Sequence, residues 1–250
     1  EDNRLFFGRQ ELVGYLIDRL HHENLLALVG LSGSGKSSLM LAGLVPALKE
    51  GVIHADGKRP GSQDWHYYPT MVPGSNPLQN LAHILRPPNA KGDEWMAVSS
   101  QRLLKKPQYL PYFVNKQLDC PAVITVDQFE EVFTLCTDEN MRQAFVHSLS
   151  HFVLAQPGWH TVILTLRADY ESYVTSLATD DSHKFRAVYD LGRVQITPLT
   201  YGELREVIER PAKLVGLTFD KGLVDKIVRH ALGDPSALPL VQFTLTELWK

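Results

Sequence analysis

Short apolar runs and segments of helical periodicity alternate along most of the chain. Three runs, at residues 25–30, 122–127 and 161–166, place hydrophobic residues on both faces of an extended chain. Runs of this kind are typical of strands buried within a parallel sheet. Weaker strand patterns lie at residues 67–72 and 194–197. The pattern therefore predicts five strands.

Helical stripes separate these strands, with apolar residues spaced three and four apart. They cover residues 11–20, 38–48 and 141–154. Strands that alternate with helices form right-handed crossovers, so we expect an α/β core with a five-stranded, mostly parallel sheet covered on both faces. Residues 51–92 are rich in Pro, Gly and Asn and predict only a short helix at 78–85.

After Pro198 the pattern changes to helices alone. Apolar stripes at helical spacing cover residues 203–213, 223–232 and 240–249. Gly233 stands where a glycine commonly ends a helix. We therefore predict an α/β core over residues 1–197 and a small, all-helical lid domain over residues 198–250, which is cut short at its C-terminus.

Composition and charge narrow the class of protein. The chain has 250 residues, 44% of them hydrophobic, and 25 basic against 28 acidic side chains give a net charge of −3. No run of like charges predicts a nucleic-acid arm or a polybasic membrane patch, although a basic groove could still form. Two cysteines, Cys120 and Cys136, favour a reducing, cytoplasmic setting. No apolar run approaches the roughly 18 residues that span a bilayer.

The strongest chemical signal is the glycine-rich segment at residues 30–37, GLSGSGKS. It fits the Walker A pattern G-x-x-x-x-G-K-[ST] and lies between a predicted buried strand and a predicted helix. Glycines let successive N–H groups point at phosphate oxygens, and the helix N-terminus adds partial positive charge. The candidate nucleotide-binding residues here are Ser32, Gly33, Ser34, Gly35, Lys36, Ser37 and Ser38. The alternative is a tight turn that binds nothing.

Two oxygen donors are candidates for Mg²⁺. Lys36 would reach the β- and γ-phosphates, and the Ser37 hydroxyl would ligate the ion. Asp127 ends the second buried strand at the edge where α/β sheets place their ligands, so it is the other expected ligand. Asp127 could instead cap a helix, with Glu130 completing a capping box.

Glu130, Glu131 and Arg167 are the candidate catalytic residues. One of the two glutamates could orient or deprotonate the attacking water, while the other is structural or exposed. The sequence leaves open which is which. Arg167 leaves the third buried strand, where a guanidinium could bind two oxygens of the γ-phosphate. Its alternative role is an ion pair with Asp169 or Glu171.

Several segments together resemble the signal-transduction NTPases of the STAND class, and most of all the bacterial novel-STAND group often joined to WD or other repeats. They are FFGRQEL, GLSGSGKSSL, VDQFEEVF, LTLRADY and ALPLVQFTLTELW. The resemblance implies a P-loop NTPase core with a helical lid, and ATP or ADP with Mg²⁺ as ligands. It also implies slow, regulatory hydrolysis and a switch between a closed ADP state and an oligomerising ATP state.

The resemblance also suggests where the rest of the nucleotide binds. It implies that Phe7, Gly8 and Arg9 lie beside the adenine and that Pro239 contacts the nucleotide from the lid. Gln10 departs from the class, which usually has Glu at that position. The expected partners are an adenine nucleotide, further copies of the chain in the ATP state, and the effector and repeat-sensor domains of a longer chain.

Two weaker motifs do not change this interpretation. Residues 115–119 imitate the guanine-reading N-K-x-D, but they contain an extra residue and precede the acidic strand, so GTP is not expected. His147 and His151 have zinc-helix spacing without a third ligand.

Two other functions compete with an ATP-driven switch. A nucleic-acid-remodelling or replication-type ATPase with a lid would use the same phosphate chemistry, but the net charge of −3 weighs weakly against nucleic acid. A small-molecule phosphotransferase would need a basic lid over the phosphates. The predicted lid helices are instead apolar and mixed in charge.

Overall fold

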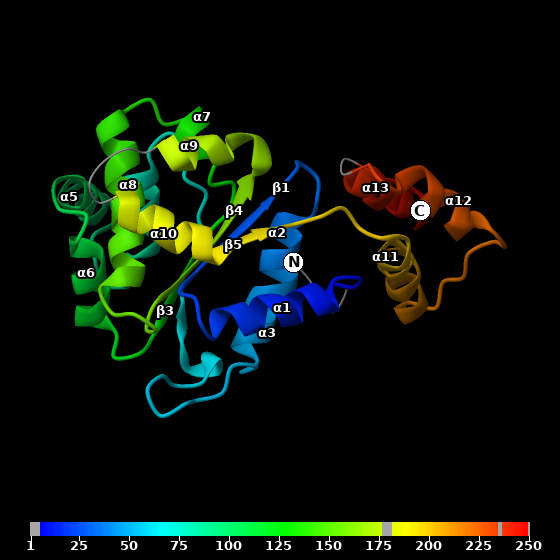
Figure 1. Ribbon diagram of the computed structural model, residues 1–250, viewed down its shortest axis with the longest axis horizontal. Helices are drawn as coiled ribbons and strands as arrows, with labels where there is room; N and C mark the ends of the chain where they lie inside the picture. Colours follow the sequence, from blue (N-terminus) through cyan, green and yellow to red (C-terminus); the bar gives the residue numbers. More distant parts are fainter. Residues whose placement is uncertain (1–5, 177–181, 235–236, 250) are drawn as a thin grey trace.

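A five-stranded parallel sheet forms the centre of the protein (Figure 1). The computed structural model describes residues 6–176, 182–234 and 237–249. The strand order is β2-β3-β4-β1-β5. The strands are β1 (Leu25–Gly30), β2 (His66–Tyr67), β3 (Ala122–Val126), β4 (Thr161–Arg167) and β5 (Arg193–Gln195). The prediction of a five-stranded parallel sheet is confirmed.

The edge strand β2 is shorter than the run at residues 67–72 predicts. The amide of Tyr68 still donates to Val123, and Met71 forms an isolated parallel bridge with Val126. Pro69 lies between these two contacts and has no N–H to donate to the ladder. The chain therefore follows β3 beyond β2 without forming a continuous strand.

Both faces of the sheet are covered by helices, as expected. In β1, Leu25, Ala27 and Val29 contribute to one buried cluster, while Leu26 and Leu28 contribute to the other. The first face carries α4 (Pro77–Ile84), α5 (Gly92–Lys105), α6 (Tyr109–Gln117), α8 (Glu139–Leu154) and α10 (Ser182–Gly192). The second carries α1 (Gln10–Leu20), η2 (Leu39–Leu44) and α3 (Val45–Lys49).

The helix after the glycine-rich loop is present but is not a regular α-helix. It begins as α2 (Lys36–Ser38), widens into the π-helical segment η2 and continues as α3 to Lys49. Pro46, at the start of α3, lacks the N–H of a regular i→i−4 bond. Gly43 in η2 gives the Phe6 ring room to pack, because a Cβ there would lie 2.6 Å from that ring.

Several helices were not predicted from the sequence. In α5 the apolar residues are sparse, and α6 has Pro111 in its first turn, where proline is tolerated. The others are α10 and four short elements, η3 (Ser62–Asp64), α7 (Glu131–Thr134), η4 (Ala168–Tyr170) and α9 (Glu171–Ser176).

The last three helices form a small separate core. They are α11 (Tyr201–Leu214), α12 (Leu223–Ala231) and α13 (Ala237–Trp249). Leu204, Ile208, Val224 and Val228 pack together between them. Figure 1 shows these C-terminal helices beside the sheet, joined to β5 by a short linker. The domain boundary at residue 198 stays a prediction.

None of the helices in the described part of the chain combines the length and apolar character needed to cross a bilayer.

Candidate functional site

The glycine-rich loop, residues 30–37, connects the end of β1 to α2 at the carboxyl edge of the sheet. Gly33 and Gly35 have φ of 77° and 83°, in the left-handed region that favours glycine. A Cβ on Gly30 would lie 2.9 Å from the Ile196 carbonyl oxygen and from Ser34 Oγ. Three of the motif's glycines are therefore required by local geometry, and we call this segment the phosphate loop.

Lys36 is folded back over the phosphate loop. Its ammonium donates to the carbonyl oxygens of Gly30 at 3.0 Å and Leu31 at 2.8 Å. Burial lowers the pKa of Lys36, while the nearby Glu130 carboxylate acts to raise it. The side chain is thus a largely buried cation beside the loop that phosphates would occupy.

Ser37 and Asp127 come together although 90 residues separate them. The Ser37 hydroxyl donates to Asp127 Oδ1 at 2.7 Å, and the Thr165 hydroxyl donates to the same oxygen at 2.5 Å. Asp127 does not cap a helix, because α7 begins at Glu131 and has no side-chain cap. The carboxylate instead faces the phosphate loop.

Glu130 and Glu131 point to different places. Glu130 Oε2 accepts a hydrogen bond from the backbone N–H of Arg167 at 3.2 Å, whereas Glu131 Oε2 accepts one from Gly74 at 3.0 Å. Burial raises the pKa of Glu130, and the charges of Lys36 and Arg167 oppose that shift. Of the two glutamates, Glu130 is the one beside the phosphate-loop lysine.

Arg167 forms a two-bond ion pair with Asp169. Its Nε and Nη2 lie 3.1 and 2.6 Å from the two carboxylate oxygens, and its side chain is 41% exposed. The hydrogen bonds to Asp169 raise the pKa of Arg167. Glu171, the other expected partner, binds Arg193 instead. A phosphate contact through the same Nε and Nη2 groups would therefore require Arg167 to leave Asp169.

The segment Phe7-Gly8-Arg9 packs against α11. Arg9 is 8% exposed and donates to the Thr197 carbonyl oxygen at 2.5 Å and to Glu203 Oε1 at 3.3 Å. Gly8 has a φ of 81°, and a Cβ there would lie 2.6 Å from the Glu203 carbonyl oxygen. The Arg210 guanidinium lies 5.7 Å from the centre of the Phe7 ring. This segment therefore connects the sheet domain to α11.

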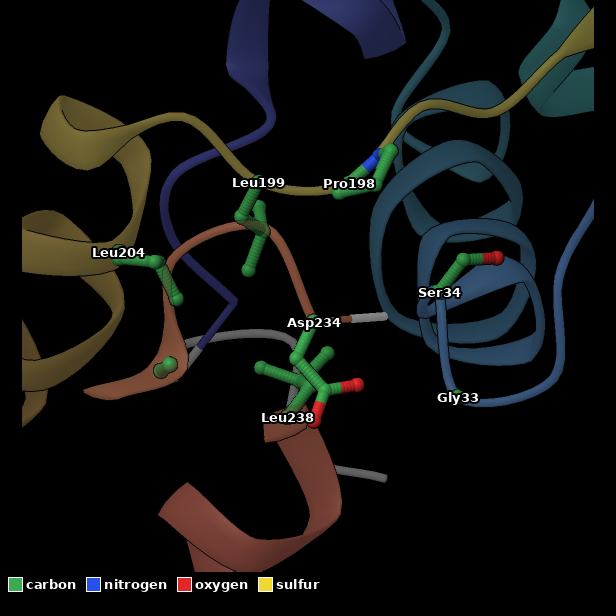
Figure 2. Close-up of a pocket in the computed structure, with 8 residues that line it drawn as sticks. Gly33, Ser34, Pro198, Leu199, Leu204, Asp234 and Leu238 are labelled. Atoms are coloured by element: carbon green, nitrogen blue, oxygen red, sulfur yellow. The ribbon is translucent and has the colours of Figure 1, made fainter. Parts of the chain in front are cut away.

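A small pocket of about 10 Å³ separates the phosphate loop from the C-terminal helices (Figure 2). It is lined by Gly33, Ser34, Pro198, Leu199, Leu204, Ala231, Asp234 and Leu238. A Cβ on Gly35 would lie 3.3 Å from Leu238 Cδ2, whereas Pro239 is exposed. Leu238 belongs to the same ALPL motif as Pro239 but was not among the residues predicted from the sequence. At this point the C-terminal helices nearly touch the loop.

The parallel sheet, the phosphate loop after β1 and the Asp127 carboxylate that faces that loop define a P-loop NTPase. The family model described as novel STAND NTPase 1 matches residues 1–250. The chain therefore belongs to this family, and the resemblance drawn from the sequence motifs is confirmed.

Three solved structures have a similar fold. A Walker-type ATPase of Pyrococcus abyssi has a TM-score of 0.57 and 16% identity, over 93% of this chain and 65% of that one. The Orc1 protein of Aeropyrum pernix, solved in complex with DNA, has a TM-score of 0.58 and a sequence identity of 15%. The match covers 96% of this chain and 58% of that one. Domain III of the Thermotoga maritima replication initiation protein DnaA has a TM-score of 0.54 and a sequence identity of 11%. The match covers 95% of this chain and 83% of that one.

At sequence identities of 16%, 15% and 11%, these similarities show a shared fold and nothing more. This chain spans 65% and 58% of the first two proteins, which is less than two thirds of their length. Comparison with curated proteins gives no match.

Proposed function

We propose that this chain is an ATP-binding signal-transduction switch that hydrolyses ATP slowly and changes conformation with the bound nucleotide. The observation that carries the proposal is the cluster of phosphate-binding side-chain types at one edge of the sheet. Lys36 and Ser37 follow β1, Asp127 follows β3, and the Ser37 and Asp127 side chains are in contact. Membership of an NTPase family supports this assignment.

The phosphates would bind in the loop at residues 30–37. In this proposal the Lys36 ammonium exchanges the carbonyls of Gly30 and Leu31 for phosphate oxygens, which is a local rearrangement. The N-terminus of α2 supplies backbone N–H groups. The residues expected around the phosphates are Ser32, Gly33, Ser34, Gly35, Lys36, Ser37 and Ser38.

The donors at this edge fit Mg²⁺. Ser37 and Asp127 supply oxygen ligands, and Mg²⁺ commonly binds one or two protein groups together with phosphate oxygens. Within the described ranges, no cluster of three or more His, Cys, Asp and Glu side chains offers a different metal site. We assign the ion to Ser37 and Asp127, where it would neutralise phosphate charge when bound.

Glu130 is our candidate for orienting the attacking water and accepting its proton. Its raised pKa brings it nearer to neutral pH, which suits a general base. Glu131 is held by Gly74 and has a structural role in this proposal. Arg167 would exchange the Asp169 carboxylate for the γ-phosphate, because a guanidinium binds either anion with two parallel bonds.

The adenine would lie between the N-terminal segment and the C-terminal helices. Phe7, Gly8 and Arg9 contact α11 at this junction, and Leu238 of α13 lines the neighbouring pocket. The contact of Pro239 with the nucleotide is what the family resemblance implies. The pocket of about 10 Å³ holds about one water molecule, so nucleotide entry requires the helices to move. We propose a core over residues 1–197 and a hinged lid over residues 198–250.

The wider role rests on the family alone. We propose a cytoplasmic protein in which the ATP state assembles copies of the chain and the lid communicates with effector and repeat-sensor domains. Binding energy divided between core and lid would let ADP and ATP favour different lid positions through their different contacts.

A calorimetric titration with ATP and ADP, combined with phosphate release and mass measurement, tests this function. We expect both nucleotides to bind, phosphate to be released slowly, and mass to increase with ATP. An absence of nucleotide binding would contradict the proposal.

A replication-type or nucleic-acid-remodelling ATPase is the second candidate. The fold resembles the Orc1 protein solved with DNA and domain III of DnaA, which favours keeping this possibility. The mass measurement separates the two. Assembly that depends on ATP alone supports the switch, whereas assembly that also requires DNA or RNA supports the alternative.

A further inference from the structure

The end of β4 is bonded to the acidic segment at residues 127–130. The Thr165 carbonyl oxygen accepts the Phe129 N–H at 2.9 Å, and the Arg167 N–H donates to Glu130 Oε2 at 3.2 Å. The Thr165 hydroxyl donates to Asp127 Oδ1 at 2.5 Å and accepts the Gln128 N–H at 2.9 Å. Three consecutive residues after Asp127 are thus held by a single neighbouring strand.

The backbone of the acidic segment needs this support. Gln128 has a φ of 54°, and among the described residues it alone is a non-glycine with positive φ. Such a conformation is sparsely populated and persists where the surrounding structure imposes it. The Gln128 N–H is bonded to Thr165 Oγ1 and, at 3.1 Å, to Asp127 Oδ1. The Thr165 hydroxyl therefore contributes to a conformation that Gln128 would otherwise disfavour.

The same hydroxyl sets the orientation of the Asp127 carboxylate. Oδ1 accepts bonds from Ser37 Oγ, Thr165 Oγ1 and the Gln128 N–H. These donors come from the helix after β1, from β4 and from the segment after β3. Because Thr165 is 1% exposed, removing its hydroxyl would take a buried hydrogen-bond partner from Asp127 Oδ1 and from the Gln128 N–H.

We propose that Thr165 is a positioning residue for the metal-binding carboxylate. Its hydroxyl holds Asp127 in the orientation that Mg²⁺ and nucleotide require. This inference rests on the proposed function, since it assumes that Asp127 serves the ion. Groups that orient a metal ligand from outside the coordination sphere typically change metal affinity or activity by about 10- to 100-fold when removed.

Thr125 provides a matched control on the neighbouring strand. It is also a buried threonine in the sheet, 3% exposed, and its hydroxyl pairs with that of Thr70 at 2.7 Å. Thr165→Val and Thr125→Val each remove one buried hydroxyl at nearly constant volume. Thr165→Ser retains the hydroxyl. Thr165→Ala is a second variant without the hydroxyl, and it has a smaller side chain than valine.

The first readout is nucleotide affinity with Mg²⁺ and with a chelator, measured by calorimetry. We expect Thr165→Val and Thr165→Ala to weaken the Mg²⁺-dependent part of ATP affinity by about 10-fold or more. Thr165→Ser and Thr125→Val should bind as the wild type does. If Thr165→Val and Thr165→Ala keep the wild-type Mg²⁺ dependence, Thr165 does not position the metal ligand.

The second readout needs neither metal nor nucleotide. Amide hydrogen exchange at Gln128 should be faster in Thr165→Val and Thr165→Ala than in the wild type or Thr165→Ser. Unchanged exchange would overturn the inference even if affinity fell. If the wild type itself binds nucleotide without any Mg²⁺ dependence, the metal assignment to Asp127 fails, and this outcome is distinct from a failure at Thr165 alone.

Discussion

The candidate nucleotide site lies between two surfaces built from different chemistry. At the sheet edge, short polar side chains bond directly to one another, as Ser37, Asp127 and Thr165 do. On the other side, the C-terminal helices approach the loop through leucines such as Leu204 and Leu238. An ion pair of Arg9 with Glu203, 3.3 Å apart, joins the N-terminal segment to α11.

Because the two surfaces differ in chemistry, one can control nucleotide binding and the other nucleotide release. A hydrogen-bonded edge has a defined geometry, and moving it would leave buried polar groups unpaired. An apolar contact is not directional, so helices can separate from the loop without breaking many specific bonds. We expect the sheet edge to set affinity for phosphate and metal, and the C-terminal helices to set how long the nucleotide stays. The following substitutions test that division.

The largest effect should come from Glu130→Gln, which removes the proposed base and keeps the side chain's shape. Hydrolysis should fall by roughly 100-fold or more, with ATP affinity retained. Single-turnover phosphate release measures the first and calorimetry the second. The wild-type rate should also decline as the pH falls through the raised pKa of Glu130, because the base is then protonated.

Glu131→Gln is the control for that experiment. A glutamine oxygen can still accept the Gly74 N–H, so both affinity and hydrolysis should stay near wild type. Equal loss of hydrolysis in both variants, or in neither, would contradict the assignment to Glu130.

Lys36→Ala should weaken ATP and ADP binding by roughly 10- to 100-fold, since hydrogen bonds to charged groups contribute about 1.5–3 kcal/mol. Calorimetry measures the loss, and thermal unfolding checks the fold. Lys116→Ala removes an exposed lysine of the rejected guanine-like motif and should change nothing. Undiminished affinity in Lys36→Ala would mean that the phosphate loop does not bind the phosphates.

Glu203→Gln should speed ADP dissociation by a few-fold, because a partly exposed ion pair contributes about 1 kcal/mol or less. Glutamine can keep the capping box that Glu203 forms with Thr200 at the start of α11, so the helix should persist. Stopped-flow release of a fluorescent ADP analogue measures the rate. An unchanged rate would show that the Arg9 contact does not hold the lid.

The smallest effect distinguishes Leu238 from Pro239. Leu238→Ala removes the apolar side chain that lines the pocket beside the phosphate loop and should speed ADP release by more than Pro239→Ala, because Pro239 is exposed. The same release assay compares them. A larger effect from Pro239→Ala would favour the contact that the family resemblance implies.

The sheet edge was the more predictable of the two surfaces for a physical reason. The phosphate loop is a local sequence pattern between a strand and a helix, and Asp127 ends an apolar run. Parallel strands bring such ends to one edge of a sheet, so the meeting of Ser37 with Asp127 follows from the pattern.

Other contacts depended on partners distant in sequence. Glu131 is distinguished from Glu130, the candidate base, by its hydrogen bond from the Gly74 amide. The need for glycine at position 8 comes from its close approach to the backbone of α11. No local pattern near either residue identifies these partners. The helix α5 was missed because its apolar positions are few and it is stabilised by packing on α4 and α8.

Hydrogen exchange over residues 201–249, with no nucleotide, with ADP and with ATP, tests the central claim most directly. If the nucleotide lies between the sheet edge and a hinged lid, ADP should increase protection of α11 and α13, and ATP should protect them differently. Lys36→Ala should remove both changes at the same nucleotide concentration. Identical exchange in all three states, in a protein that calorimetry shows to bind ATP and ADP, would contradict a lid that responds to the nucleotide.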